Sequence, residues 1–319
     1  MSFSNIIGQD KAVALLLKQL SGNRTPHAYL FSGPSGVGRK KAALELARTL
    51  NCTNLKENFL SCNECASCLK IEKEIHPDIH IIDFNYQAML LDEAPEKQAQ
   101  LRIDTIRELQ KTINMKTNES TWKVFIIDPA EKLTADSANC LLKTLEEPPK
   151  NSLLVLISTA KELLPQTIVS RCQHIRFNRL RYENVLEIIK RREFENLNNM
   201  EDIITLSDGS AGKAINLIND TDKLSVTLAL WNGLKNKTIQ TEQLFELSET
   251  VSKDRQLLNE IINDLLILSR TSLLESGNTE LIGFMLQCKK AIKYNVNTNL
   301  LADILFLKLQ DFSKNNTLQ

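Results

Sequence analysis

Apolar residues follow two different patterns along this chain, and the pattern changes near residue 177. Short apolar runs, which are typical of buried strands, lie at 27–32, 79–84, 124–128, 153–158 and 174–177. Helical patterns separate them, as at 38–50, 103–115 and 134–145. This alternation predicts an α/β fold with a largely parallel sheet and helices on both faces. The polar segment 85–100 is expected to be a surface loop.

Beyond residue 177 every apolar pattern is helical. A small helical segment is expected over 179–220, where the turn at 207–210 separates two helices. From about Leu224 onward apolar residues recur at helical spacing, which predicts amphipathic helices that need a partner face. That partner is either another chain or the rest of a self-contained bundle. Residues 313–319 are expected to form a frayed tail.

A glycine-rich loop lies between the first predicted strand and the helix that follows it. The segment 33–40 reads GPSGVGRK, and Gly33, Gly36 and Gly38 allow backbone N–H groups to wrap a phosphate. A working loop of this kind has lysine and then serine or threonine at its end. Here Arg39 takes the lysine position and Lys40 the hydroxyl position. The loop is therefore a degenerate nucleotide site.

The second predicted nucleotide-site element is the run 124–128, which brings Asp128 to the carboxyl end of a buried strand. Such a carboxylate normally steadies Mg²⁺, and hydrolysing proteins of this class place another acid directly after it. Position 129 is proline instead, and Glu131 is expected to point elsewhere as an acid in a first helical turn. Hydrolysis by this chain alone is therefore not expected.

Nucleotide binding remains open at this stage. The glycine backbone, Asp128 and the two cations could still hold ATP or ADP weakly. Alternatively, Arg39 could fold into the pocket and replace the phosphate contacts.

Four of the seven cysteines are grouped along the chain, at Cys52, Cys62, Cys65 and Cys68. Two overlapping C-x-x-C steps and a fourth thiolate can close a tetrahedral shell around a structural Zn²⁺. Unrelated thiols or a redox pair are the alternatives, and His76 and His80 are spare ligands nearby. The other three cysteines, Cys140, Cys172 and Cys288, are isolated in the sequence and expected to be structural.

Composition narrows the choice of partners and of compartment. The 39 basic and 39 acidic side chains cancel, so contact with nucleic acid needs a local patch or a partner protein. An apolar content of 42% is ordinary for a soluble protein, and 319 residues suffice for two or three domains. We expect a cytoplasmic protein without membrane contact, since the sequence shows neither a signal peptide nor a membrane-spanning apolar run.

Two further motifs connect these features to a known family. They are LLKTLEEPP at 141–149 and LPQTIVSRC at 164–172. Together with the glycine loop and the cysteine group, they resemble the bacterial replicative clamp-loader family of AAA+ proteins, and within it the delta-prime subunits of DNA polymerase III. The resemblance runs from about Phe3 to about Phe177.

The resemblance implies a domain organisation and a set of partners. It implies an AAA+ (RecA-like) domain over 1–178 with an inserted zinc module at 52–68, a helical lid over 179–220 and a helical collar over 221–319. The implied partners are gamma/tau ATPase subunits and delta in a hetero-pentamer that places a sliding clamp on primer–template DNA. The implied role is that of a non-hydrolysing stator.

The same resemblance gives Arg171 a function in trans. The string Ser170-Arg171-Cys172 matches the motif with which the family completes the ATP site of a neighbouring subunit. A guanidinium can stabilise the charge that develops on a transferring phosphoryl group. A surface arginine in a salt bridge is the alternative. Cys172 is expected to pack beneath it.

Two phosphate-sensing positions of the family fall on less suitable residues. Ser158 and Thr159 take the first, although local hydrogen bonding that ends a strand is the favoured interpretation. Gly212 takes the second, and the adjacent Lys213 would project about 100° away around a helix. Two other functions stay open: an active ATP-hydrolysing loader subunit, and a zinc-stabilised DNA-binding module.

Overall fold

A computed structural model describes residues 3–22, 25–192, 194, 199–235, 241–276, 279–292, 294 and 296–315. The chain forms two compact units, one of Met1–Ile188 with Ser210–Gly212 and one of Ile189–Gly209 with Lys213–Gln319. The first unit thus extends past residue 178, where the AAA+ domain is predicted to end.

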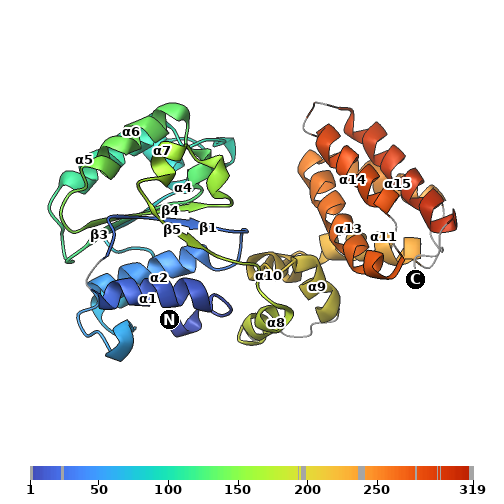
Figure 1. Ribbon diagram of the computed structural model, residues 1–319. Helices are drawn as coiled ribbons and strands as arrows, with labels where there is room; N and C mark the ends of the chain where they lie inside the picture. The colour runs from blue at the N-terminus through green and yellow to red at the C-terminus, as the bar shows by residue number, and fades with distance from the viewer. Residues whose placement is uncertain are drawn as a thin grey trace. The chain divides into compact units, whose positions relative to one another are not determined.

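A five-stranded parallel sheet forms the centre of the first unit (Figure 1). Its strands are β1 (Ala28–Ser32), β2 (Ile79–Ile82), β3 (Lys123–Ile127), β4 (Ser152–Ser158) and β5 (Gln173–Arg176), in the order β2-β3-β4-β1-β5. All four pairings are parallel. Every residue of β1, β3 and β4 is buried, as expected for a parallel sheet covered on both faces. The predicted strands and sheet are confirmed.

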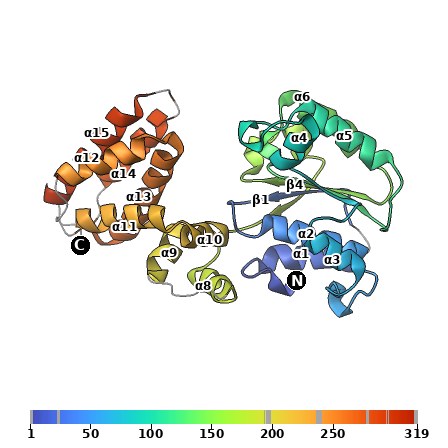
Figure 2. The same cartoon turned by 180° about the vertical axis from the view of Figure 1, so that it is seen from behind.

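Two helical layers cover the sheet (Figures 1 and 2). On one face lie α1 (Asp10–Ser21), α2 (Arg39–Asn51) and α3 (Ala66–Glu72), and on the other α4 (Phe84–Leu91), α5 (Ile103–Asn114), α6 (Ala135–Glu146) and α7 (Gln166–Val169). Alternate strand residues serve the two cores: Tyr29 and Phe31 pack on the first side, Leu30 on the second. Short 3₁₀ turns lie at Phe3–Asn5, Glu57–Phe59, Pro95–Lys97, Ala130–Lys132 and Lys161–Leu163.

The prediction of a surface loop over 85–100 is wrong. This segment contains α4 and a 3₁₀ turn, and Asp83 caps α4 by accepting the N–H of Tyr86 at 2.8 Å. The fully buried Gln87 binds the Gln98 side chain at 2.6 Å and the Arg102 backbone N–H at 2.6 Å. Gln87 and Gln98, two of the polar residues of the segment, therefore face inward, where they bind each other and the backbone.

Among the described residues, the elements that follow the sheet are all helices, as predicted. They are α8 (Tyr182–Lys190), α9 (Met200–Ser207), α10 (Ala211–Asn219), α11 (Thr221–Lys235), α12 (Thr241–Ser252), α13 (Arg255–Ser276), α14 (Thr279–Ile292) and α15 (Thr298–Asn315). The turn between α9 and α10 contains Asp208 and Gly209, both at positive φ. Leucines and isoleucines of α11 to α15 form one apolar core.

Two further observations concern the helices of the chain. The prediction of a frayed tail from residue 313 is wrong as far as Asn315, because α15 continues to that residue. Residues 316–319 lie outside the described part.

Among the described helices, none is long and apolar enough to cross a membrane.

Candidate functional site

The glycine loop joins β1 to α2 at the carboxyl edge of the sheet. Gly33 follows β1, and its N–H donates to the carbonyl of Ser158 at the end of β4, at 3.2 Å. Its φ is 147°, and a Cβ there would lie 2.2 Å from the carbonyl oxygen of Phe177. Gly38, at φ 103°, precedes the first residue of α2. The backbone of a phosphate loop is therefore formed.

The middle of the loop is covered by the start of α10. The carbonyl of Gly36 accepts the N–H of Gly212 at 2.9 Å, and the hydroxyl of Ser210 donates to the carbonyl of Ser35 at 2.8 Å. Gly36 has a φ of 72°, and a Cβ on it would lie 2.3 Å from the Ser210 oxygen. Residues 210–212 therefore lie directly against the loop, and only glycine fits at position 36.

Arg39 is buried in the site and faces two acids. Its exposed fraction is 7%, and its Nη1 has no hydrogen-bond partner among the described residues. Burial lowers the pKa of Arg39, while the charges of Asp128 and Glu131 oppose that shift. Arg39 stands at the loop position of the phosphate-binding lysine, and its buried charge interacts with those of two carboxylates. This arrangement favours the interpretation that Arg39 folds into the pocket.

Asp128 directly follows β3 and lies at the sheet edge, as predicted. Burial raises its pKa, and the charge of Arg39 counteracts that rise. Glu131 is an acid in the first turn of the 3₁₀ helix Ala130–Lys132, as expected, and its carboxylate also binds Thr159, which follows β4. Its Oε1 accepts both the N–H of Thr159, at 3.1 Å, and the hydroxyl of Thr159, at 2.8 Å.

The two residues that end β4 differ in their hydrogen bonds. Ser158 bonds locally, its hydroxyl donating to the carbonyl of Ala160 at 2.9 Å, as predicted. Thr159 does not, because its partner Glu131 is distant in sequence. Burial raises the pKa of Glu131, but the hydrogen bonds from its own backbone N–H and from Thr159 outweigh that effect and lower the pKa.

Two cations of the predicted site are engaged elsewhere. Lys40 forms an ion pair at 2.9 Å with Glu74, beyond the end of α3, and both side chains are partly exposed. Lys213 forms an ion pair at 2.6 Å with the buried Asp264 of α13. At the second sensing position, a Cβ on Gly212 would lie 2.8 Å from the Cα of Gly36, so no side chain fits there in this arrangement.

Gln9 belongs to this region but was not predicted from the sequence. It is buried just before α1, and its amide donates to the carbonyls of Asn178 at 2.7 Å and of Val37 at 3.3 Å. It also accepts the N–H of Asn178 at 3.0 Å. Its position directly before α1 gave no signal for this role, because a glutamine there provides no cap.

Arg171 lies between α7 and β5 on the surface of the first unit. Its guanidinium pairs with Glu146, the last residue of α6, at 2.7 Å, and donates to the carbonyl of Thr167 at 3.0 Å. Its side chain is 36% exposed, so both interactions are accessible to water. Cys172 packs against the second core, and burial raises the pKa of its thiol to about 12.

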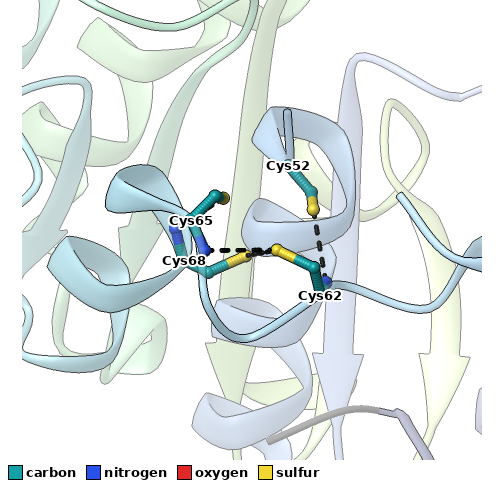
Figure 3. Close-up of side chains that lie close together, drawn as sticks. All are labelled: Cys52, Cys62, Cys65 and Cys68. Atoms are coloured by element: carbon teal, nitrogen blue, oxygen red, sulfur yellow. Dashed lines mark hydrogen bonds between the residues drawn. The ribbon is translucent and has the colours of Figure 1, made fainter. Parts of the chain in front are cut away.

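The four grouped cysteines converge at the other end of α2 (Figure 3). Cys52 ends α2, Cys62 follows the loop, and Cys65 and Cys68 begin α3; all four sulfur atoms lie within 4.8 Å of one another. The predicted grouping of these four side chains is therefore present, and the cluster can hold a metal ion. His76 and His80 stay outside it: His76 accepts the N–H of Asp78, and His80 stacks on Phe125.

Backbone N–H groups point at the sulfur atoms of the cluster. Cys52 accepts from the N–H of Cys62 at 3.3 Å, and Cys62 from that of Cys65 at 3.3 Å. Burial raises the pKa of the Cys65 thiol, but hydrogen bonds from Cys68 and Thr53 outweigh it and lower the pKa to about 6. Donors of this kind stabilise thiolates, which are the metal-binding form of cysteine.

Comparison with known proteins gives the family. Residues 8–181, more than half of the chain, match the model of the family described as DNA polymerase III, delta subunit. A Bacillus subtilis protein, "DNA polymerase III subunit delta'", is 38% identical over 54% of this chain and 48% of its own length. A Buchnera aphidicola protein, "DNA polymerase III subunit gamma", is 34% identical over 70% of this chain and 59% of its own length.

A solved structure shows the same fold. The gamma subunit-related protein of DNA polymerase III from Thermotoga maritima superposes with a TM-score of 0.51 at 16% identity, over 93% of this chain and 99% of that one. The fold is the AAA+ fold predicted from the sequence. The chain spans about half the length of the curated relatives it matches. By the match of more than half its length, the chain belongs to the DNA polymerase III delta-subunit family, which is a clamp-loader family.

Proposed function

We propose that this chain is a non-hydrolysing subunit of a replicative clamp loader, of the delta-prime type, and that Arg171 completes the ATP site of a neighbouring subunit. The observation that carries the proposal is the state of its own loop. Arg39 is buried at the loop position where an active site needs a lysine, and its charge interacts with those of Asp128 and Glu131. ATP or ADP would bind weakly or not at all.

Arg171 supports the second half of the proposal. It lies at the surface, and its partners Glu146 and Thr167 are exposed, so a competing phosphate could replace them at small cost. A guanidinium delivered to the γ-phosphate of another subunit stabilises the charge that grows in the transition state. Arg171 is in this proposal a catalytic residue in trans.

The remaining features fit a subunit that is fixed in a ring. We propose that Cys52, Cys62, Cys65 and Cys68 hold a structural Zn²⁺, since four thiolates leave no open position for a substrate. On α15, the apolar side chains of Leu300, Ile304 and Leu307 are exposed at helical spacing. This stripe would pack in a collar formed with gamma/tau-type and delta-type subunits.

A second candidate function is an active ATP-hydrolysing subunit. It is favoured by one observation, the 34% identity to a gamma subunit over 229 residues. The two candidates differ in what the purified chain does by itself. An active subunit turns over ATP alone, whereas the proposed subunit does not.

The test is reconstitution with candidate ATPase and delta-type subunits and a sliding clamp. We expect the chain alone to show no ATP turnover above a blank, and the full complex to form and to load the clamp on primer–template DNA. Appreciable turnover by the chain alone would favour the second candidate. Failure to assemble with any such subunit would remove both.

A further inference from the structure

A cavity of about 550 Å³ opens at the carboxyl edge of the sheet beside β5. Its wall contains the outer start of the glycine loop at Gly33 and Pro34 and the segment that follows β4. Among the residues that the structure describes, Arg39, Lys40 and Asp128 do not line it. The cavity thus borders the degenerate nucleotide site at Gly33 and Thr159 but does not contain its cations or Asp128, and the charged side chains of the cavity have no assigned use.

Two polar side chains from neighbouring strands meet in this cavity. The hydroxyl of Ser32, at the end of β1, lies 2.6 Å from Nε2 of His174 on β5. The β1–β5 register pairs Leu30 with His174 and Ser32 with Arg176, so both β5 side chains point to the same face of the sheet. Sheet pairing thus fixes the positions of a hydroxyl, an imidazole and a guanidinium.

The lining of the cavity is strongly positive. Lys161, Arg176 and Arg179 contribute three cations and Glu162 one carboxylate. Within the described ranges of the chain, neither the Lys161 ammonium nor the Arg176 guanidinium makes a hydrogen bond or an ion pair. Burial lowers the pKa of His174, and the charges of Lys161 and Arg176 lower it further against the opposing effect of Glu162. His174 thus experiences a positive local field.

We propose that this cavity binds a small, multiply charged phosphate anion of the diphosphate class. The size of the cavity lies in the range of small-molecule sites, whereas a nucleic-acid strand needs an extended basic groove. An ammonium and a guanidinium from different elements, Lys161 and Arg176, can neutralise two phosphoryl groups and donate charge-assisted hydrogen bonds. The inference does not depend on the proposed function, because Lys161, Arg176 and His174, which carry it, take no part in that function.

The test is titration calorimetry of the full chain with inorganic pyrophosphate in magnesium-free buffer. We expect one site, and a dissociation constant raised about tenfold or more in the double variant Lys161→Gln/Arg176→Gln, since two charged donors are lost. The side chains of Lys161 and Arg176 are both exposed, so the fold should tolerate the two substitutions. The matched control is Lys143→Gln/Lys150→Gln, which removes two exposed lysines outside the cavity and should leave the constant unchanged.

A site-specific readout uses the four histidine rings of the chain. Bound pyrophosphate should shift the ring signals of His174 in NMR spectra and raise its titration midpoint, while the signals of His76 and His80 stay in place. The signal of His174 is identified by its loss in His174→Gln. The inference is overturned if the double variant binds pyrophosphate as the wild type does. Equal binding of sulfate, or loss of binding in Arg39→Gln alone, would also overturn it.

Discussion

The two ends of α2 carry two sites that differ in how much of their ligand-binding chemistry is present. At the amino end, the glycine loop keeps its backbone geometry, but Arg39 and residues 210–212 fill it with the chain's own atoms. At the carboxyl end, four cysteine sulfur atoms lie within 4.8 Å of one another, with N–H donors directed at them. One helix thus carries a glycine loop covered by the chain itself and a cysteine cluster that can hold a metal ion.

The difference shows that a site can have the backbone shape that suits a ligand without the side chains that bind it. Packing maintains the loop, since Gly33 and Gly36 contact the backbone or side chains of Phe177 and Ser210 and would be required even without a nucleotide. The cysteine cluster has no comparable packing reason to keep four thiols together. Its geometry is therefore stronger evidence for a bound ion than the loop is for a bound phosphate.

The largest expected effect tests the cysteine cluster. Cys65→Ser should abolish stoichiometric zinc, measured by elemental analysis of the purified chain, and markedly lower thermal stability. Structural zinc sites supply on the order of 10 kcal/mol in isolated zinc-binding peptides, so losing one thiolate removes a large share of the local stability. The control is Cys140→Ser, where the side chain can keep its hydrogen bond to Gln110. Retained zinc in Cys65→Ser would break the comparison.

A smaller effect tests the filled end. Gly36→Ala should lower the free energy of unfolding by about 3 kcal/mol, because the methyl group meets Ser210 and the backbone is at positive φ. Gly38→Ala is the matched control, since its φ is also positive but a Cβ meets no atom within 4 Å. It should cost only about 1 kcal/mol. Urea unfolding of both variants gives the comparison, and equal losses would mean that residues 210–212 do not cover the loop.

The smallest expected effect comes from the hydrogen bonds of Asp78, which follows α3 and is not one of the clustered cysteines. The buried Asp78 accepts the backbone N–H groups of Asn118, Glu119 and Ser120 at 2.7 to 3.0 Å. Burial raises its pKa, but these bonds outweigh it and lower the pKa to about 2. Because this value lies below that of the unfolded chain, the carboxylate stabilises the fold above about pH 4 by about 2 kcal/mol.

That stability should disappear as the pH falls from about 4 to about 2. Unfolding measured against pH, with zinc removed beforehand by a chelator, isolates this contribution. Asp78→Asn should lose the dependence, while Asp104→Asn, which changes an exposed carboxylate, should keep it. If Asp78→Asn kept the pH dependence of the wild type, the hydrogen bonds of Asp78 would not be its cause.

The sequence predicted the features that periodicity and spacing report directly. Strands of the parallel sheet stood out because β1, β3 and β4 are apolar throughout, and the cysteines because their ligand spacing is short and specific. It failed at α4, since the buried Gln87 and Gln98 give that segment the composition of a polar loop, and it did not predict the contact between Glu131 and Thr159, which are distant in sequence. The cavity beside β5 could not be predicted, because Ser32, Lys161 and Arg176 meet only through the strand order.

The most direct test of the central claim is ATP turnover by a reconstituted loader that carries Arg171→Ala in this chain. Hydrolysis at the neighbouring site should fall by on the order of 10³-fold while the complex still assembles. Glu146→Ala removes the partner of Arg171 but leaves the guanidinium free, so turnover should persist. Unchanged turnover in Arg171→Ala, or equal losses in both variants, would contradict a role for Arg171 in another subunit's active site.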